Sequence, residues 1–300
     1  MNTVPSSTYF SAAPDWSWLI VLYFFFGGLA GGCYFIAALV DLLGQPEDRP
    51  LARLGYYIAF PCVIVSAVLL TLDLGRPLRF WHMLIESNTF RPMFKYWSPM
   101  SVGAWALLIF GIFSLLSFLG ALVEDDRLAW PAGRKLRPPG MLSAVIAMIG
   151  GLMGFYVAGY TGVLLAVTNR PIWSDTPLLG MLFIVSAASI SAALMILLAP
   201  GSRTTNSGVA ALHRMDAWIV MLEFIVLIAF LISLGSVFRA WLSAWGLLLL
   251  VVILLAMIFP IALYWRREWL GDRNLITSAI SVLVGGFLLR LVIVFSAQGV

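Results

Sequence analysis

Charged residues are scarce in this sequence: they make up 11% of its 300 residues, whereas 62% of the residues are hydrophobic. A soluble domain is about a quarter charged and about half apolar, so a water-soluble fold is excluded. The chain has two cysteines, Cys33 and Cys62, each inside an apolar run. Two isolated cysteines exclude a disulfide-stapled secreted fold. They also exclude an iron–sulfur cluster bound by this chain alone, because such a cluster needs four ligands.

Eight apolar runs are long enough to cross a bilayer as a helix of about 20 residues. Runs such as LLLLVVILLAMIF lack the alternation that a membrane β-barrel requires. The first run is too long for a cleavable signal peptide and follows no basic segment, so we expect it to be a span. The predicted fold is all-α, an integral membrane bundle forming one domain over residues 1–300. The predicted spans are about 17–41, 54–73, 97–122, 138–168, 175–199, 212–236, 244–265 and 275–297.

Basic residues predict how the helices are oriented. Eight crossings place both termini on one side, with the loops after spans two, four and six. Six basic residues lie on that side and eleven on the other, which predicts the other side to be cytoplasmic. We therefore expect both termini on the outer side, which is the periplasm in a Gram-negative bacterium. We interpret the net charge of +4 as part of this topology signal rather than as evidence of a nucleic-acid site. The six are Arg76, Arg79, Arg91, Lys95, Arg170 and Arg239; the eleven are Arg49, Arg53, Arg127, Arg134, Lys135, Arg137, Arg203, Arg214, Arg266, Arg267 and Arg273.

The spans contain small residues and ionisable residues, which we interpret separately. GGLAGG at 27–32 places glycines one helical turn apart, which predicts close helix packing. Span six carries Asp216 and Glu223, and span eight carries Arg290, although ionisable groups are costly in a bilayer. At about 1.5 Å per residue, Glu223 lies roughly 16 Å and Arg290 roughly 21 Å from the inner side. Those depths permit direct or water-bridged pairing, and both a proton path and a structural ion pair stay open.

The outer loop between spans two and three, residues 73–97, has four basic residues and a density of aromatic rings that exceeds an interfacial belt. It predicts either the mouth of an amphipathic pocket or a docking surface for a peripheral subunit. Aromatic residues of spans one and four are expected on the same side. An apolar pocket with a few tyrosine or histidine partners suits a lipid-soluble ring that carries polar oxygens.

The two histidines do not fit a haem site. Two haem-binding histidines must lie at matching depth, whereas His82 is predicted on the outer side and His213 on the inner side, about 30 Å apart. No group of histidine, cysteine or acidic residues has the spacing of a metal site. We therefore expect the chain to hold no redox metal, so that electrons must pass through a partner.

Four segments of the chain form a pattern: WSWLIVLYFFFGGLAGG at 16–32, DLGRPLRFWHML at 73–84 leading to SPMSVGAW at 98–105, GYTGVLLAVTNRPIW at 159–173, and GGFLLRLVIVFSAQG at 285–299. Together they resemble the NrfD/PsrC family, the membrane subunits of polysulfide-reductase-like complexes. The segments extend over nearly the whole chain, and their order fits the eight-helix arrangement.

The resemblance implies a quinone-reactive subunit of a respiratory oxidoreductase in a bacterial or archaeal cytoplasmic membrane. Such a subunit exchanges electrons between menaquinone or ubiquinone and a four-cluster, ferredoxin-like iron–sulfur subunit docked on the outer face. A molybdopterin subunit carries the catalytic site for the terminal substrate. The membrane chain itself then has no haem, no cluster and no catalytic residue, and some family members are proposed to translocate protons.

The resemblance also implies roles for single residues. Quinone binds near the outer face, with Tyr160 of the YTG run as the expected hydrogen-bond partner of a quinone oxygen. Some members have a histidine where this sequence has Tyr23. The predicted quinone-binding residues are Tyr23, Arg79, His82, Tyr160 and Trp173, and the predicted proton path comprises Asp73, Asp216, Glu223 and Arg290.

Two other classes of function are compatible with eight spans. A secondary transporter for a small solute or ion would use buried charges on spans six and eight, although transporter sites usually show interrupted helices in two repeats, and no convincing repeat is present. A receptor or structural anchor would leave Glu223 and Arg290 as structural residues only.

Overall fold

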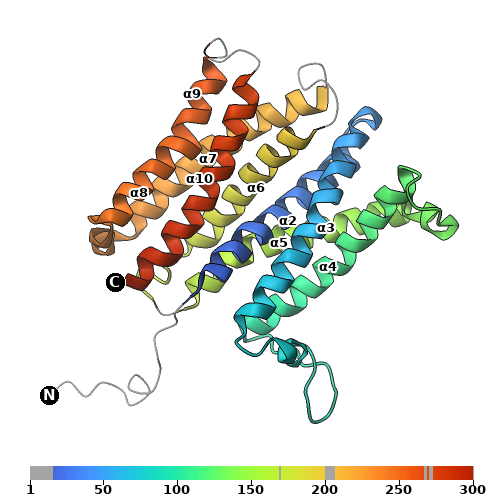
Figure 1. The fold of residues 1–300 in the computed structure, drawn as a ribbon, viewed down its shortest axis with the longest axis horizontal. Helices are drawn as coiled ribbons and strands as arrows, with labels where there is room; N and C mark the ends of the chain where they lie inside the picture. Colours follow the sequence, from blue (N-terminus) through green and yellow to red (C-terminus); the bar gives the residue numbers. More distant parts are fainter. Residues whose placement is uncertain (1–15, 169, 200–206, 267–268, 270–272, 300) are drawn as a thin grey trace.

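A computed structural model describes residues 16–168, 170–199, 207–266, 269 and 273–299 (Figure 1). Over these ranges the chain is almost entirely helical and has no β-strand, only an isolated bridge between Ile85 and Pro92. Eight helices are long and apolar enough to cross a membrane, which confirms the predicted all-α fold. Asn169, Arg203 and Arg267, which belong to the sequence patterns above, lie outside the described residues.

The spans are slightly longer or shorter than predicted at their ends. The seventh consists of α8, the π-turn η5 and α9 in succession. The helices are α2 (Trp18–Leu43), α3 (Arg49–Asp73), α4 (Pro99–Glu124), α5 (Met141–Ala166), α6 (Leu178–Leu198), α7 (Ser207–Ser233), α8 (Ala244–Ile253), η5 (Leu254–Ile258), α9 (Phe259–Trp265) and α10 (Asn274–Ser296), with short 3-10 helices η1 (Pro46–Asp48), η2 (Pro77–Met83), η3 (Pro131–Leu136), η4 (Gly235–Trp241) and η7 (Ala297–Gly299).

The bundle has two distinct ends (Figure 1). We call the end with η2 and η4 the η2 end, and the end with η1 and η3 the η1 end. The first and last described segments meet at the η2 end. There the Trp16 backbone N–H donates to Gln298 Oε1 at 3.2 Å, and Gln298 Nε2 donates to the Trp16 carbonyl at 3.0 Å. An even number of crossings therefore brings the two ends of the described chain together.

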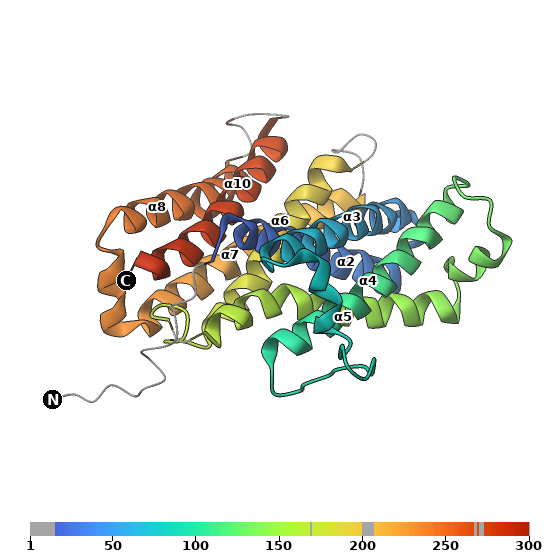
Figure 2. The same ribbon diagram turned by 60° about the horizontal axis from the view of Figure 1, so that its bottom comes forward.

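Helices α2, α6 and α10 form the centre of the bundle. In their most apolar stretches 72%, 67% and 61% of the residues are buried, compared with 33% in α4, α7 and the seventh span. Helix α2 packs against α3, α5 and α6, and α6 packs in turn against α5, α7 and α10 (Figure 2). The outer helices expose leucine, isoleucine and valine side chains, as expected for surfaces that face lipid.

Glycines let the central helices approach at backbone distance. A Cβ atom at Gly31 would overlap the Gly154 carbonyl oxygen of α5 and lie 3.2 Å from Ala158 Cβ. A Cβ at Gly32 would lie 2.7 Å from the Ala187 carbonyl oxygen of α6. Without a hydrophobic force between helices in lipid, such close contact supplies much of their association.

We predict that Gly31→Ala destabilises the bundle, because the new methyl group has no space between α2 and α5. Overpacking typically costs about 1–3 kcal/mol, so the melting temperature of the detergent-purified chain should fall by several degrees. Gly111→Ala is the matched control, since a Cβ there would meet only Val63 Cγ1 at 3.5 Å, an ordinary contact. Equal melting temperatures for the two variants would contradict this account of the packing.

Candidate functional site

Polar side chains of α2, α3 and α5 meet around Gly27 in the half of the bundle nearer the η2 end. A Cβ at Gly27 would lie 3.6 Å from Tyr23 Cε2, 3.7 Å from Ser66 Oγ and 3.8 Å from Thr161 Cγ2. Tyr160 lies close enough to Tyr23 for the two phenols to interact electrostatically. All four side chains are buried. We call Tyr23, Ser66, Tyr160 and Thr161 the tyrosine cluster.

The tyrosine cluster contains a hydroxyl group with an unmet hydrogen-bonding need. Ser66 is completely buried, and its Oγ has no hydrogen-bond partner in the described part of the chain. Buried polar groups in native proteins are nearly always hydrogen-bonded to protein or to water. Ser66 Oγ can therefore form a further hydrogen bond.

Tyr160 is held by α4 in a fixed direction. Its hydroxyl donates a hydrogen bond to the Pro99 carbonyl oxygen at 2.6 Å. A Cβ at Gly103 would overlap the Tyr160 hydroxyl and ring, so the glycine of the SPMSVGAW segment makes room for this side chain. Because the hydroxyl hydrogen is engaged by Pro99, the Tyr160 oxygen is left as an acceptor. The ring stacks against half-exposed Tyr156, with centroids 6.0 Å apart, toward the outer surface of the bundle.

The other predicted quinone-binding residues lie outside this cluster. Trp173 is fully buried, donates from Nε1 to the Ile293 carbonyl at 2.7 Å, and packs against Trp16 at 5.5 Å between ring centroids. Arg79 and His82 belong to η2, where Arg79 is exposed and His82 lies beside Trp81. No hydrogen bond or ring contact joins these three residues to the tyrosine cluster within the described ranges. A series of ring contacts through Trp16 and Phe24 connects Trp173 to Tyr23.

Arg290 occupies the middle of the bundle with no exposure to solvent. Its Nε donates to the Phe24 carbonyl of α2 at 3.2 Å, and its Nη1 donates to Ser186 Oγ of α6 at 3.1 Å and to the Gly286 carbonyl at 2.7 Å. The guanidinium carbon lies 5.5 Å from the centroid of the Phe183 ring. Nη2 has no partner among the described residues. A Cβ at Gly28 would lie 2.9 Å from it, so a larger residue there would displace the guanidinium.

Asp216 and Glu223 extend from Arg290 along α7. Both carboxyl groups are buried, and Ser186 and Ser189 of α6 lie within interaction range of them. The described residues include no direct ion pair between Glu223 and Arg290. Ser186, which interacts with both, stands between them. One oxygen of each carboxyl group has no hydrogen-bond partner in the described structure. We call Asp216, Ser189, Glu223, Ser186 and Arg290 the buried polar column.

Asp73, also predicted for the proton path, lies apart from the column. It is the last residue of α3 at the η2 end and is exposed. It accepts a hydrogen bond of 2.6 Å from Ser17 Oγ, while Ser17 Oγ accepts one from the Leu19 backbone N–H as the N-cap of α2. Its observed contact therefore ties the start of α2 to the end of α3.

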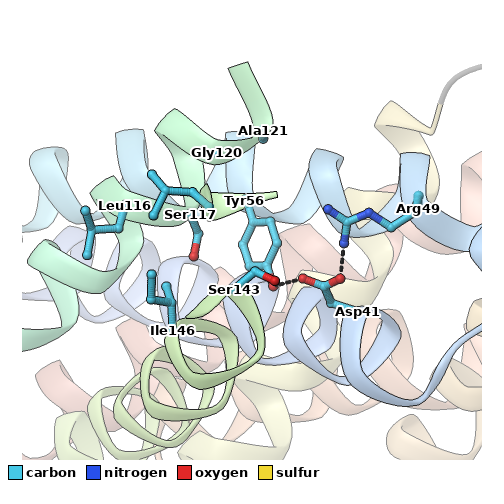
Figure 3. Close-up of a pocket in the computed structure, with 10 residues that line it drawn as sticks. Asp41, Arg49, Tyr56, Leu116, Ser117, Gly120, Ala121, Ser143 and Ile146 are labelled. Atoms are coloured by element: carbon cyan, nitrogen blue, oxygen red, sulfur yellow. Dashed lines mark hydrogen bonds and ion pairs between the residues drawn. The ribbon is translucent and has the colours of Figure 1, made fainter. Parts of the chain in front are cut away.

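A third polar group, at the η1 end of α2, α3 and α4, was not singled out from the sequence (Figure 3). Asp41 accepts a hydrogen bond from the Tyr56 hydroxyl at 3.0 Å and forms an ion pair with Arg49. Arg49 also donates to Glu124 Oε2 at 2.6 Å. These charged residues lie at the ends of spans. From the sequence alone, charges at such positions indicate only where a span ends and which way it is oriented. The short spacing of Asp41 and Arg49 around the α2–α3 connection is the one signal that could have indicated their pairing.

The histidines and cysteines form no metal site in the described structure. No group of three or more histidine, cysteine or acidic side chains comes together there. Cys33 and Cys62 are buried free thiols. His82 lies at the η2 end, and His213 lies toward the η1 end of α7, against the Tyr264 ring with centroids 5.3 Å apart.

Comparison with known proteins gives a consistent family. The family described as polysulphide reductase, NrfD, matches residues 10–300. One chain of the polysulfide reductase of Wolinella succinogenes is 29% identical over 234 residues, which cover 75% of this chain and 71% of that protein. Protein NrfD of Escherichia coli is 27% identical, with 94% of this chain and 95% of that protein covered.

One subunit of the selenate reductase of Mesobacillus selenatarsenatis is 28% identical over 102 residues, 34% of this chain and 22% of that protein. The family match extends over nearly the whole chain and agrees with the four sequence segments and with the eight spans. The chain is a multi-pass membrane protein that belongs to the polysulphide reductase NrfD family, as its sequence motifs predict.

Proposed function

We propose that this chain is the membrane subunit of an oxidoreductase complex and exchanges electrons between the quinone pool and an iron–sulfur partner subunit. The observation that carries the proposal is the tyrosine cluster, where buried hydroxyl-bearing side chains of three helices meet around Gly27 and Ser66 Oγ has no partner among the described residues. Family membership supports it, as do the relatives that are named as components of polysulfide and selenate reductases. The membrane concerned is the bacterial or archaeal cytoplasmic membrane.

The chemistry of the tyrosine cluster fits a quinone headgroup. Quinones are flat apolar rings with two polar oxygens, and such ligands suit apolar sites that contain a few placed hydrogen-bonding groups. Menaquinone or ubiquinone bound there supplies the carrier of two electrons and two protons. Ser66 can donate or accept a hydrogen bond, whereas the Tyr160 oxygen is left to accept one because its hydrogen is bonded to Pro99. That acceptor favours the reduced form, whose hydroxyl groups donate.

The exposed surface at the η2 end supplies a place for the partner. Between α3 and α4 the chain exposes Leu78 by 89%, Tyr96 by 76%, Phe90 by 73% and Trp97 by 68%. Exposed apolar groups of this kind mark interaction surfaces. We assign this surface to a four-cluster iron–sulfur subunit, which passes electrons to or from a molybdopterin subunit. Asp73 and the η2 residues Arg79 and His82 lie at the same end, where Asp73 and His82 can pass quinol protons to water.

The buried polar column supports a second part of the function, proton translocation coupled to electron exchange. Carboxyl groups without full hydrogen bonding are expensive in an apolar bundle and indicate function. Asp216, Glu223 and Arg290 lie within interaction range of Ser189 or Ser186 along α7, α6 and α10. The buried polar column can therefore transfer protons from one side chain to the next.

The first test is co-purification. When the tagged chain is extracted gently from its native membrane, we expect iron–sulfur and molybdopterin subunits in the mass spectrum and ubiquinone or menaquinone in an organic extract. Quinone should copurify because the tyrosine cluster buries its headgroup. A chain that purifies alone and without quinone would contradict the proposal and favour a secondary transporter, which uptake of labelled solutes by liposomes would then examine.

Tyr160→Phe should weaken quinol binding, because it removes the hydroxyl oxygen that accepts from quinol. One hydrogen bond is worth about 1.4 kcal/mol, which corresponds to a roughly tenfold higher KM for a soluble quinol analogue in the intact complex. Tyr156→Phe is the matched control, one turn earlier on α5 and half-exposed. A KM unchanged in Tyr160→Phe, or raised equally in both variants, would argue against Tyr160 as a quinol ligand.

Glu223→Gln should abolish proton translocation, because it keeps the shape of the side chain but can no longer take up and release a proton. We expect the ratio of protons moved to electrons transferred in proteoliposomes to fall at least fivefold, with uncoupled quinol oxidation retained within about twofold. Glu47→Gln, an exposed residue of η1, serves as the control. An unchanged ratio in Glu223→Gln would leave the buried polar column with a structural role only.

A further inference from the structure

A small surface pocket opens near the η1 end between α7, α9 and α10. Its lining includes His213 and Asp216 from α7, Pro260 and Tyr264 from α9, and Ser278 from α10. His213 and Tyr264 are half-buried, whereas Asp216 and Ser278 are buried. The pocket therefore runs from the partly exposed side chains at its mouth to a carboxyl group inside the bundle. We call it the α7–α9–α10 pocket.

Asp216 is the only acidic residue among those that line the α7–α9–α10 pocket. It is 4% exposed, and its Oδ1 has no hydrogen-bond partner in the described structure. His213 lies three residues earlier on α7, a spacing that places both side chains on one face of the helix. Proton transfer requires two titratable groups close together. His213 supplies a ring at the mouth of the pocket, and Asp216 supplies an incompletely bonded carboxyl group at its base.

The α9 wall of the pocket follows a break in the seventh span. The π-turn Leu254–Ile258 precedes Pro260, which lines the pocket and lacks a backbone N–H. Helix α10 holds this irregular backbone in place, because Ser281 Oγ donates to the Leu255 carbonyl and Asn274 Nδ2 donates to the Leu263 carbonyl at 2.8 Å. Single π-turns inside α-helices occur frequently at functional sites.

The base of the pocket is also the start of the buried polar column. Asp216 interacts with Ser189, and Ser189 lies within range of Glu223, which is linked through Ser186 to Arg290. Arg290 in turn contacts the Phe24 carbonyl of α2, next to Tyr23 of the tyrosine cluster. A series of polar side chains thus leads from the pocket toward the centre of the bundle.

The other polar pocket at this end contains a carboxyl group whose bonding is complete. There both oxygens of Asp41 are engaged, one by Tyr56 and the other by Arg49 (Figure 3). Neither oxygen of this carboxyl group is left without a partner. The contrast with Asp216, whose Oδ1 has no hydrogen-bond partner among the described residues, selects the α7–α9–α10 pocket.

We propose that the α7–α9–α10 pocket is the inlet through which the buried polar column exchanges protons with water at the η1 end. The proposal rests on the proton route of the proposed function and names its entry. A proton from water binds a ring nitrogen of His213, passes to Oδ1 of Asp216, and moves on to Glu223 past Ser189, which lies within range of both carboxyl groups. No electron moves in this step, and no other covalent bond changes.

Cysteine labelling in the assembled complex tests whether water reaches the base of the pocket. Ser278→Cys should react with a negatively charged, membrane-impermeant thiosulfonate from the side on which exposed Arg214→Cys reacts, and not from the other side. Ser114→Cys, a buried serine of α4 outside the pocket, is the matched control. The unsubstituted chain gives the background, since Cys33 and Cys62 are buried.

We expect Ser278→Cys to react at least tenfold faster than Ser114→Cys. Equal rates would overturn the inlet, whatever the complex does with protons. If Ser278→Cys fails to assemble, Ala217→Cys replaces it, because Ala217 also lines the pocket.

Proton uptake by proteoliposomes then separates the inlet from the proposed function. Labelling Ser278→Cys should lower proton uptake from the η1 side at least fivefold, while labelling Arg214→Cys, next to His213 but on the exposed face, should leave it unchanged. Full labelling of Ser278→Cys with undiminished uptake would overturn the inlet and leave the proton route standing. A complex that takes up no protons from that side would overturn both the inlet and the proton route. Quinol oxidation, measured separately, would still test the proposed electron exchange.

Discussion

The burial of Arg290 is the constraint on which the centre of the bundle depends. A guanidinium group inside a membrane-spanning bundle is costly unless its N–H groups are bonded. Here α2 supplies the Phe24 carbonyl, α6 supplies Ser186 and the face of Phe183, and α10 supplies the Gly286 carbonyl. These are also the three most buried spans. The arrangement of α2, α6 and α10 is therefore tied to one charged side chain that all three must contact.

Helix α2 meets this constraint with four glycines that have different neighbours. Gly27 faces the tyrosine cluster, Gly28 leaves room for the Arg290 guanidinium, Gly31 meets α5 and Gly32 meets α6. A side chain at any of the last three positions would overlap or crowd its neighbour. In lipid, where apolar surface gains little from burial against another helix, small residues of this kind decide which helices come together. The GGLAGG segment thus serves packing and borders both the tyrosine cluster and Arg290.

Much of the fold was predictable from the sequence, because charged residues are rare inside spans and their positions leave countable gaps. Contacts between neighbouring helices could not be predicted in the same way. The bond from Tyr160 to Pro99 depends on the register of α5 against α4, which no local pattern encodes. Ser66 gives no signal within an apolar run, since serine is common in membrane helices. The π-turn lies in an uninterrupted apolar run. Asp41 and Arg49 lie near the ends of spans, where a charged residue is expected whether or not it is paired.

The degree of hydrogen bonding differs among the buried carboxyl and hydroxyl groups. Asp41 is bonded at both oxygens, as a group that only joins helices should be, because an incompletely bonded buried group costs stability. Ser66, Asp216 and Glu223 each retain an unpartnered oxygen among the described residues. Their positions bear on the proposed coupling: Tyr23 of the tyrosine cluster and Phe24, whose carbonyl holds Arg290, are consecutive on α2. The tyrosine cluster and the buried polar column therefore share helix α2, which is the element through which the proposed coupling of electron exchange to proton movement would act.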